Sequence, residues 1–356
     1  MKLNVNENIK KTVRVFPMQG RYDYKRYDMN ENPEGLPKTF VNSVLKEITP
    51  EFLSIYPEPD RFLNKYAKFL GKGVKYENLM ATNGSDMAIR YLLETFGEVG
   101  KEVVTVSPSF EMYWVNCNIL GLKHVPVLYE DDLTINIDKI VSAINENTRV
   151  VVLLNPNNPV GNAFTEDEVK NVIKKAKNVG AVVIIDEAYH YFYDKTFLDY
   201  ALNEENVIVL RTFSKLMSIA ACRLGVIISN PTIIDYVKRS KLTFDVNSIA
   251  LLFGERLIEH PEIIDNLIKI SKEGKKYAIS DLKKKKYWCK DCKGNFIFIK
   301  PNHDAHEISK RLETEKKILV HPYGNGMLHD LIRVSTGSKK AMKIFLDAFY
   351  EIDGDK

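Results

Sequence analysis

The sequence predicts an α/β fold in which a large, mostly parallel sheet is followed by a smaller α+β domain. From about residue 100, short apolar runs alternate with helix-like segments, which is the pattern of parallel strands joined by helices. The runs are nearly continuous in Val, Ile and Leu, as expected for strands covered on both faces. Near residue 246 the order of elements changes, because two long helical stretches follow one another there.

Five apolar runs are the expected strands of the large sheet. They span Val103–Ser107, Arg149–Leu154, Ala181–Ile185, Val207–Leu210 and Leu224–Ser229. A helix is expected after Thr165, because Thr165-Glu-Asp-Glu168 has the form of a capping box. Gly180 is expected to end this helix.

The C-terminal part is expected to form the smaller domain. Helices are predicted at 248–259, 261–286, near 304–314 and from Ser338, and strands at Phe296–Lys300, Ile318–His321 and Leu331–Ser335. Residues 1–40 are irregular and cannot form a core alone. We therefore divide the chain into an N-terminal segment (1–45) that packs on the small domain, a large domain (46–245) and a small domain (246–356).

Composition and charge argue against several classes of function. The 356 residues include 51 basic and 47 acidic side chains, a net charge of +4, which is too even to indicate nucleic acid as the main partner. The N-terminus lacks the apolar core of a signal peptide, and no run approaches the roughly 20 apolar residues of a membrane helix. We therefore expect a cytoplasmic protein that binds neither nucleic acid nor membranes.

Four cysteines are too few to indicate a disulfide framework in a chain of this length. Cys289 and Cys292 have the spacing of metal ligands, but the sequence has no second pair to complete a zinc site. They also lead directly into the predicted strand at Phe296. We therefore predict no metal site and a structural role for this pair.

Polar side chains follow the predicted strands, at the edge of the sheet where ligands bind in such folds. Asp186 ends a wholly apolar strand, where an acid is costly without a cationic partner. Asn158 lies in a loop that two prolines and a glycine restrict. Lys215 and Arg223 follow the strand that ends at Leu210.

An anion site is predicted where Thr82-Asn-Gly-Ser-Asp86 opens a helix, because free N–H groups and the helix dipole favour negative charge. Thr212, Ser214 and Arg223 can complete a phosphate cradle. The cradle, the buried acid Asp186, an amide and a lysine together meet the needs of pyridoxal phosphate. This cofactor requires a holder for its dianion, a partner for its pyridinium nitrogen, a donor to its ring oxygen and an amine.

Several motifs occur in a specific order between residues 15 and 345. Three of them are Asn155-Pro-Asn-Asn-Pro-Val-Gly161, Asp186-Glu-Ala-Tyr189 and Arg211-Thr-Phe-Ser-Lys215 with Arg223. The others are Met29-Asn-Glu-Asn-Pro33, Tyr56-Pro-Glu-Pro-Asp60, Asn83-Gly-Ser-Asp86, Pro108-Ser-Phe-Glu-Met-Tyr113 and Leu331-Ile-Arg-Val-Ser-Thr-Gly337. The first three resemble signatures of the class I/II aminotransferases of the aspartate-aminotransferase fold. The full set is most similar to their histidinol-phosphate aminotransferase branch, which implies a fold-type I pyridoxal-phosphate-dependent transferase.

The resemblance implies a role for each matched residue. Lys215 would hold the cofactor as a Schiff base and then act as the proton shuttle. Asp186 would pair with the pyridinium nitrogen, Tyr189 and Asn158 with the ring oxygen, and Phe110 would lie on the ring. The residues around the cofactor phosphate would be Gly84, Ser85, Asp86, Thr212, Ser214 and Arg223.

The resemblance also implies a homodimer and a substrate site. Tyr56 would reach the cofactor phosphate of the neighbouring subunit. Arg333 would bind the substrate carboxylate in the bidentate geometry that suits arginine. Asn32 and His321 would be further substrate contacts.

Three positions depart from the pattern of this branch. Phe110 stands where the branch has Tyr, which removes a hydroxyl but little stacking. His321 stands where the branch has an arginine that helps hold the substrate phosphate, and an unperturbed imidazole is mostly neutral at pH 7. Glu34 replaces a tyrosine and adds a negative charge. His321 and Glu34 disfavour histidinol phosphate itself as the substrate.

The leading prediction is an aminotransferase that moves an amino group between an L-amino acid, or an amino-acid phosphate, and a 2-oxo acid. The alternative is a decarboxylase similar to threonine-phosphate decarboxylases, because both reactions need Lys215, Asp186 and an arginine for the carboxylate. A non-catalytic domain of a transcription regulator is the third candidate. It is disfavoured because the first motif begins by Met29, which leaves no room for a helix-turn-helix domain before it.

Overall fold

The computed structural model describes residues 3–14 and 16–354. Its largest sheet has seven strands in the order β2-β8-β7-β6-β5-β3-β4. Their bounds are Leu79–Asn83 (β2), Glu102–Ser107 (β3), Lys123–Leu128 (β4), Thr148–Leu154 (β5), Val182–Asp186 (β6), Val207–Thr212 (β7) and Leu224–Ser229 (β8). Only β8 runs antiparallel to its neighbours β2 and β7. The prediction of a mostly parallel sheet is therefore confirmed.

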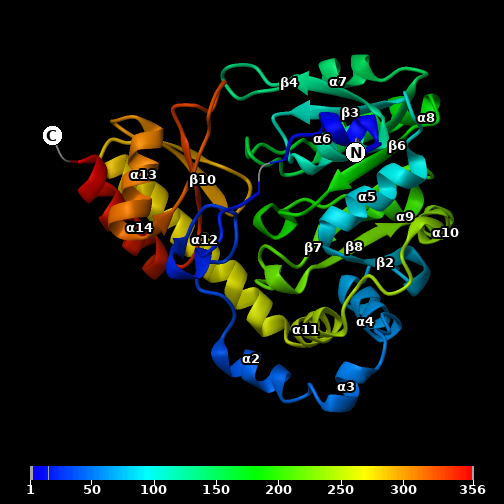
Figure 1. Cartoon of the computed structure of the whole chain (residues 1–356), viewed down its shortest axis with the longest axis horizontal. Coiled ribbons are helices and arrows are strands. Elements are labelled where there is room, and N and C mark those ends of the chain that lie inside the picture. The colour runs from blue at the N-terminus through cyan, green and yellow to red at the C-terminus, as the bar shows by residue number, and fades with distance from the viewer. Residues whose placement is uncertain (1–2, 15, 355–356) are drawn as a thin grey trace.

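Helices cover both faces of this sheet (Figure 1). One face packs against α5 (Gly84–Phe96), α6 (Met112–Leu120) and α10 (Pro231–Ser240). The other packs against α4 (Asp60–Leu70), α7 (Ile137–Ala143), α8 (Glu166–Asn178), α9 (Leu198–Asn203) and α11 (Ser248–Glu259). Neighbouring strand residues such as Val150 and Val151 face opposite clusters, and both are fully buried. This explains why the strand sequences are continuously apolar.

Local sequence signals set several element ends as predicted. Thr165 caps α8, and Glu168 returns a hydrogen bond to it in a capping box. The two outermost strands, β2 and β4, had no counterpart in the sequence prediction. β4 contains Pro126, which lacks an N–H and is tolerated mainly in edge strands, so its sequence does not have the pattern of the central strands.

The C-terminal part forms a second layered unit around its own apolar cluster. Its antiparallel sheet has the order β12-β13-β10-β9, with bounds His321–Pro322 (β12), Ile332–Ser335 (β13), Phe296–Lys300 (β10) and Trp288–Asp291 (β9). Three helices accompany it: α12 (Pro261–Lys284), α13 (Ala305–Lys316) and α14 (Lys339–Asp353). In Figure 1, α12 runs from this unit toward the large sheet and meets α11.

One predicted strand is divided in the structure. The run Ile318–His321 was expected to form a single strand, but β11 (Ile318–Leu319) pairs in parallel with β1 (Lys25–Arg26) and β12 pairs with β13. The chain changes pairing partners at Val320, which is buried. The division therefore reflects a partner, β1, that lies almost 300 residues away along the chain.

The N-terminal segment touches both parts of the molecule. β1 pairs with β11 of the C-terminal unit. In contrast, α1 (Glu7–Lys11) contacts α6 of the large sheet, and α2 (Lys38–Leu45) contacts α11. Residues 28–35, which lie between β1 and α2 in the chain, cross from the C-terminal unit to the large sheet. We call residues 28–35 the strap.

Cys289 lies in β9, and Cys292 follows it in a buried position. A Cβ on Gly161 would lie 2.3 Å from the Cβ of Cys292, so Cys292 packs directly against the loop that contains Asn158. In the described ranges, no group of three His, Cys, Asp or Glu side chains could hold a metal ion. Over the same residues, no helix is both long and apolar enough to cross a bilayer.

Candidate active site

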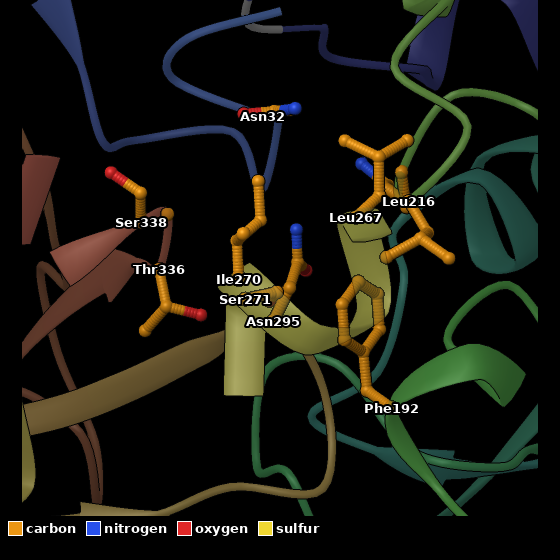
Figure 2. A pocket seen from close by; sticks show the side chains of 11 residues that line it. Asn32, Phe192, Leu216, Leu267, Ile270, Ser271, Asn295, Thr336 and Ser338 are labelled. Carbon is orange, nitrogen blue, oxygen red and sulfur yellow. The ribbon is translucent and has the colours of Figure 1, made fainter. Parts of the chain in front are cut away.

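A cavity lies where the carboxyl ends of the central strands meet the strap, α12 and the C-terminal sheet (Figure 2). Leu216, Leu267 and Phe192 lie on one side of this cavity, and Thr336 and Ser338 lie on the other. Lys215, Asn32, Ile270, Ser271, Asn295 and Gly337 complete the lining. Lys215 is the only charged side chain among these lining residues.

Lys215 follows β7 and is half-buried. Its Nζ donates a 3.0 Å hydrogen bond to the carbonyl oxygen of Met29 in the strap. The same nitrogen lies 5.8 Å from the centre of the Tyr189 ring. The amine is therefore held between the strap and the end of β6, with a single neutral acceptor.

Asp186 is buried at the end of β6. Burial raises the pKa of its carboxyl group to about 6, although hydrogen bonds from Tyr113 (2.9 Å to Oδ2) and the Ala188 N–H (3.0 Å to Oδ1) act in the opposite direction. Neither donor is a cation. A positively charged group placed beside this carboxylate would relieve the cost of burying its charge.

Tyr113 was not predicted to contact this acid, although it ends one of the recognised motifs. The motif places it on α6, one helical turn beyond Phe110. Phe110 is half-buried against the α5–α6 cluster, and both aromatic side chains line a second cavity beside β3. No sequence pattern predicts the contact of Tyr113 with Asp186, because it joins residues 73 positions apart.

The predicted anion site forms at the start of α5. Arg223 donates to Asp86 Oδ2 (2.8 Å) and to Ser214 Oγ (3.4 Å), and Thr212 Oγ1 lies 3.0 Å from Ser214 Oγ. Gly84 has φ +71°, and a Cβ there would lie 2.5 Å from Arg223 Nη2. Ser85, next in the chain, adds the next N–H of the first turn. The hydroxyls, the guanidinium group and the first turn of α5 therefore converge.

A second glycine makes this corner possible. A Cβ on Gly225 of β8 would lie 2.6 Å from the carbonyl carbon of Gly84 and 2.8 Å from the Ser85 nitrogen. No side chain larger than hydrogen fits there without moving the backbone at the start of α5. Gly225 was not predicted to be a site residue, because glycine occurs in strands for many different structural reasons.

Asn30 of the strap, which was also not predicted, belongs to one hydrogen-bond network with Tyr189, Asn158 and Arg333. Asn30 Nδ2 donates to the hydroxyl of Tyr189 (2.9 Å) and to Oδ1 of Asn158 (3.3 Å). Arg333 Nη1 donates to the same Asn158 oxygen at 2.6 Å, and its Nη2 donates to the carbonyl oxygen of Asp28 at 2.6 Å. The motif Met29–Pro33 includes Asn30, but only its other asparagine, Asn32, was predicted to be a site residue.

Asn32 and His321 flank this chain of hydrogen bonds. Asn32 Nδ2 donates to Ser218 Oγ (2.9 Å) and to the Gly35 carbonyl oxygen. His321 lies opposite Arg333 in the β12–β13 ladder and packs edge-on against Tyr323. Partial desolvation, followed by the charge of Arg333, lowers the pKa of His321 below its usual value. The imidazole is therefore neutral at pH 7.

Tyr56 lies apart from the other predicted residues. Its side chain is 71% exposed and stacks on Phe244, with ring centres 4.3 Å apart. Neither residue lines the cavity beside Lys215. Within one chain, the structure therefore brings together the residues predicted on the strand ends but not Tyr56.

Two buried polar atoms suggest that the cavity accommodates a polar ligand. Among the described residues, Asn295 Oδ1 and Thr336 Oγ1 are buried without a hydrogen-bond partner, and both residues line the cavity. Buried polar groups are normally satisfied. The donor set fits pyridoxal phosphate, because an amine, a buried acid and an anion corner lie at one edge of the sheet, where β6 and β7 end and β8 and α5 begin.

Comparison with known proteins gives a consistent family. The model of the family "Aminotransferase class I and II" matches residues 29–349. A histidinol-phosphate aminotransferase from Clostridium novyi is 32% identical, with 93% of this chain and 92% of that protein covered. A protein of the same name from Pyrococcus furiosus is 31% identical, with 90% and 92% covered.

Solved structures agree on the fold. The histidinol-phosphate aminotransferase of Sinorhizobium meliloti, described in complex with pyridoxal-5'-phosphate, has a TM-score of 0.88 at 19% identity and covers 99% of this chain and 98% of its own. An aspartate aminotransferase from Thermotoga maritima has a TM-score of 0.81 at 20% identity, with 99% and 100% covered. The chain therefore has the fold of these proteins, and it belongs to the class I and II aminotransferase family.

Proposed function

We propose that this chain is a pyridoxal-phosphate-dependent aminotransferase that moves an amino group between an L-amino acid and a 2-oxo acid. The observation that carries the proposal is that Lys215, Asp186 and the Arg223 corner lie at one edge of the sheet, where β6 and β7 end and β8 and α5 begin. When bound, pyridoxal phosphate supplies an electron sink that makes the Cα–H of an amino acid acidic. The chain's own residues supply binding, orientation and proton transfer.

Asp186 would hold the ring nitrogen of the cofactor, with Tyr113 fixing the carboxylate through Oδ2. A cation at this place favours the ionised carboxyl group and opposes the effect of burial. Tyr189 and Asn158 would contact the ring oxygen, and Phe110 would lie on the ring. All five side chains come from the carboxyl end of the sheet or from the helix and loops that follow it.

The corner at the start of α5 would hold the phosphate group. Main-chain N–H groups of Gly84, Ser85 and Asp86 carry the partial positive charge of a helix N-terminus. Arg223 adds a full positive charge, and Thr212 and Ser214 add hydroxyl donors. Asp86 holds Arg223 in place at 2.8 Å.

Lys215 would supply the amine that binds the cofactor and would then move a proton from the substrate Cα through its Nζ. Lys215 is half-buried, and among residues 3–14 and 16–354 its Nζ hydrogen-bonds only to a backbone carbonyl oxygen, with no carboxylate partner. Proton transfer by a positioned group is typically worth roughly 10²–10⁴-fold in rate.

Arg333 would bind the substrate carboxylate. Asn158 and the Asp28 carbonyl oxygen already orient its guanidinium group, and the group lies 5.7 Å from the ring centre of Phe296. An oriented guanidinium loses little freedom on binding a carboxylate with two parallel hydrogen bonds.

We also propose that the far end of the amino-donor substrate carries no phosphate. Glu34 accepts a hydrogen bond from the Ser338 N–H, which places its carboxylate at the edge of the cavity. His321 is neutral at pH 7 because its pKa is lowered. The lining also includes Phe192, Leu216, Leu267 and Ile270, which suit an apolar side chain better than a dianion.

We propose further that the chain forms a homodimer. Tyr56, Phe244, Leu242, Ile55 and Leu53 are all more than half exposed and come from the neighbouring segments 53–56 and 242–244. An exposed apolar group of this kind is typical of an interface. In such a dimer Tyr56 would reach the phosphate corner of the other subunit.

The core clusters support a modified domain division. α11 packs in the cluster of the large sheet, whereas the C-terminal half of α12 contributes Ala278 and Leu282 to the cluster of the C-terminal unit. We therefore propose that the boundary between the large and small domains lies within α12 rather than at residue 246.

A half-reaction screen tests the proposed activity. Protein loaded with pyridoxal phosphate is mixed with single amino acids and with histidinol phosphate, and the aminated cofactor and carbon dioxide are measured by mass. Aminated cofactor without carbon dioxide supports transamination, and carbon dioxide in its place supports the decarboxylase alternative. Histidinol phosphate as the best donor would overturn the proposal for the far end of the substrate.

A further inference from the structure

Asn30 occupies a central position between the two parts of the molecule. It is 1% exposed and has φ +56°, in the left-handed region that asparagine adopts more readily than most residues. Its N–H donates to Ser335 Oγ (2.7 Å), and its carbonyl oxygen accepts from Asn295 Nδ2 (2.9 Å). The backbone of Asn30 is therefore fixed by the C-terminal unit.

The side-chain amide of Asn30 points the other way, toward the large sheet. Nδ2 lies 2.9 Å from the Tyr189 hydroxyl and 3.3 Å from Asn158 Oδ1. Oδ1 of Asn30 lies 3.4 Å from Ser335 Oγ, and that hydroxyl already accepts from the Asn30 N–H. The Ser335 proton is thus available for Oδ1, which fixes the orientation of the Asn30 amide.

The chemistry of Arg333 fixes the orientation of the second amide. A guanidinium group has only donors, so the Asn158 atom 2.6 Å from Arg333 Nη1 must be the oxygen. The Asn30 atom that faces this oxygen must then be its NH₂ group. Since the same NH₂ group faces Tyr189, the Tyr189 oxygen accepts a hydrogen bond rather than donating one.

Two donors remain for a ligand as a result. Tyr189 uses a lone pair toward Asn30, so its own O–H proton is left to donate. Asn158 uses Oδ1 toward Asn30 and Arg333, and neither bond involves its Nδ2 group. A hydroxyl that accepts a hydrogen bond also becomes a stronger donor. The pair is thus arranged to bind a negatively charged oxygen.

We propose that Asn30 is a positioning residue that makes Tyr189 and Asn158 paired donors to the ring oxygen of the cofactor. The inference rests on the proposed function, because it takes the cofactor to be pyridoxal phosphate. Two donors on that oxygen favour its ionised form, which lowers the pH at which the bound cofactor loses its proton. Asn30 sets this pH without contacting the cofactor.

The test compares loaded wild-type protein with Asn30→Gly and Asn30→Asp. Glycine keeps the left-handed backbone accessible and removes the amide. Aspartate keeps the shape but replaces the donor with a charged acceptor. The readouts are the pH midpoint of the change in visible absorbance and the dissociation constant of the cofactor.

Asn30→Gly is expected to raise the midpoint by roughly 0.5–1 unit, as for the loss of one net hydrogen bond. Asn30→Asp is expected to raise it further, because its carboxylate disfavours negative charge on the nearby oxygen. Asn302→Ala is the matched control, since that exposed amide also donates to a tyrosine hydroxyl, Tyr287, at 3.1 Å. The control is expected to leave the midpoint unchanged.

A double-mutant cycle shows whether Asn30 acts through Tyr189. If it does, Asn30→Gly adds little to the shift caused by Tyr189→Phe, whereas independent effects would add. Midpoints equal to wild type in both folded Asn30 variants overturn the inference. A wild-type protein that shows no visible absorbance with pyridoxal phosphate would instead overturn the proposed function.

Discussion

The two walls of the candidate site are built in different ways. The inner wall, with Asp186, Lys215 and the Arg223 corner, comes from one edge of a single sheet, where β6 and β7 end and β8 and α5 begin. The outer wall, with Asn30, Glu34, His321 and Arg333, comes from the strap and the C-terminal sheet, where contacting residues such as Asn30 and Ser335 are 305 positions apart. In the proposed function, the inner wall supplies the residues that bind the cofactor and move the proton, and Arg333, Glu34 and His321 of the outer wall face the substrate.

This difference predicts that variants of the inner wall change cofactor binding and rate, whereas variants of Arg333 in the outer wall change substrate affinity. The following four experiments test that separation. They are ordered from the largest expected effect to the smallest.

Lys215→Ala is expected to lower kcat by at least roughly 10²–10⁴-fold, because it removes the proposed proton carrier. It should also remove the visible absorbance that borohydride erases in the loaded wild-type protein. Absorbance and rate are measured on the same samples. Lys238→Ala, on the outer face of α10, is the control, and an unchanged spectrum for Lys215→Ala would refute the assignment of this lysine.

Arg333→Ala is expected to raise KM for the amino acid roughly 10- to 100-fold, as for the loss of a charge-assisted hydrogen bond. Steady-state kinetics with the donor identified in the screen would measure it. Arg149→Ala removes a half-buried arginine at the start of β5, far from the strap, that pairs with Glu98, and it serves as the control. A fall in kcat at constant KM would place Arg333 with the inner wall and break the comparison.

Arg223→Ala is expected to weaken cofactor binding roughly tenfold, because the corner loses its full positive charge. Cofactor retained after dialysis measures this, and KM for the amino acid should change little at saturating cofactor. The control Arg239→Ala removes an exposed arginine of α10 that pairs with Asp235 and lies over the Tyr236 ring. Equal retention in Arg223→Ala and wild type would contradict the phosphate role.

Asp186 is expected to make the stability of the cofactor-free protein depend on pH. Its pKa is raised to about 6 by burial, above the roughly 3.9 of an unfolded chain. The folded state therefore binds the Asp186 proton more tightly than the unfolded chain does. The stability that this proton contributes is fully present below about pH 4 and is lost as the pH rises through about 6. Thermal unfolding from pH 4 to 7 should show the decline in wild type, and Asp186→Asn should lack it.

The central strands of the large sheet, the helix caps and the inner wall were predictable because each depends on neighbouring residues. Thr165 and Glu168 form a capping box within one turn, and Asp186 and Lys215 follow apolar runs that only buried strands require. The outer wall was harder to predict. The motif around Asn30 was noticed, but its contacts with Tyr189 and Ser335 depend on how distant segments meet. The division of Ile318–His321 has the same origin, because β1 supplies the unexpected partner.

The strap also has a consequence for the order in which the molecule forms. Its hydrogen bonds to Ser335 and Arg333 close loops of 305 residues, and long loops are entropically costly to close before the rest of the structure exists. During synthesis the strap is made 305 residues before its partner Ser335 in β13, and it must wait for that strand. The binding site is therefore completed last, and a truncated chain that ends before β13 would retain Lys215 without the strap fixed beside it.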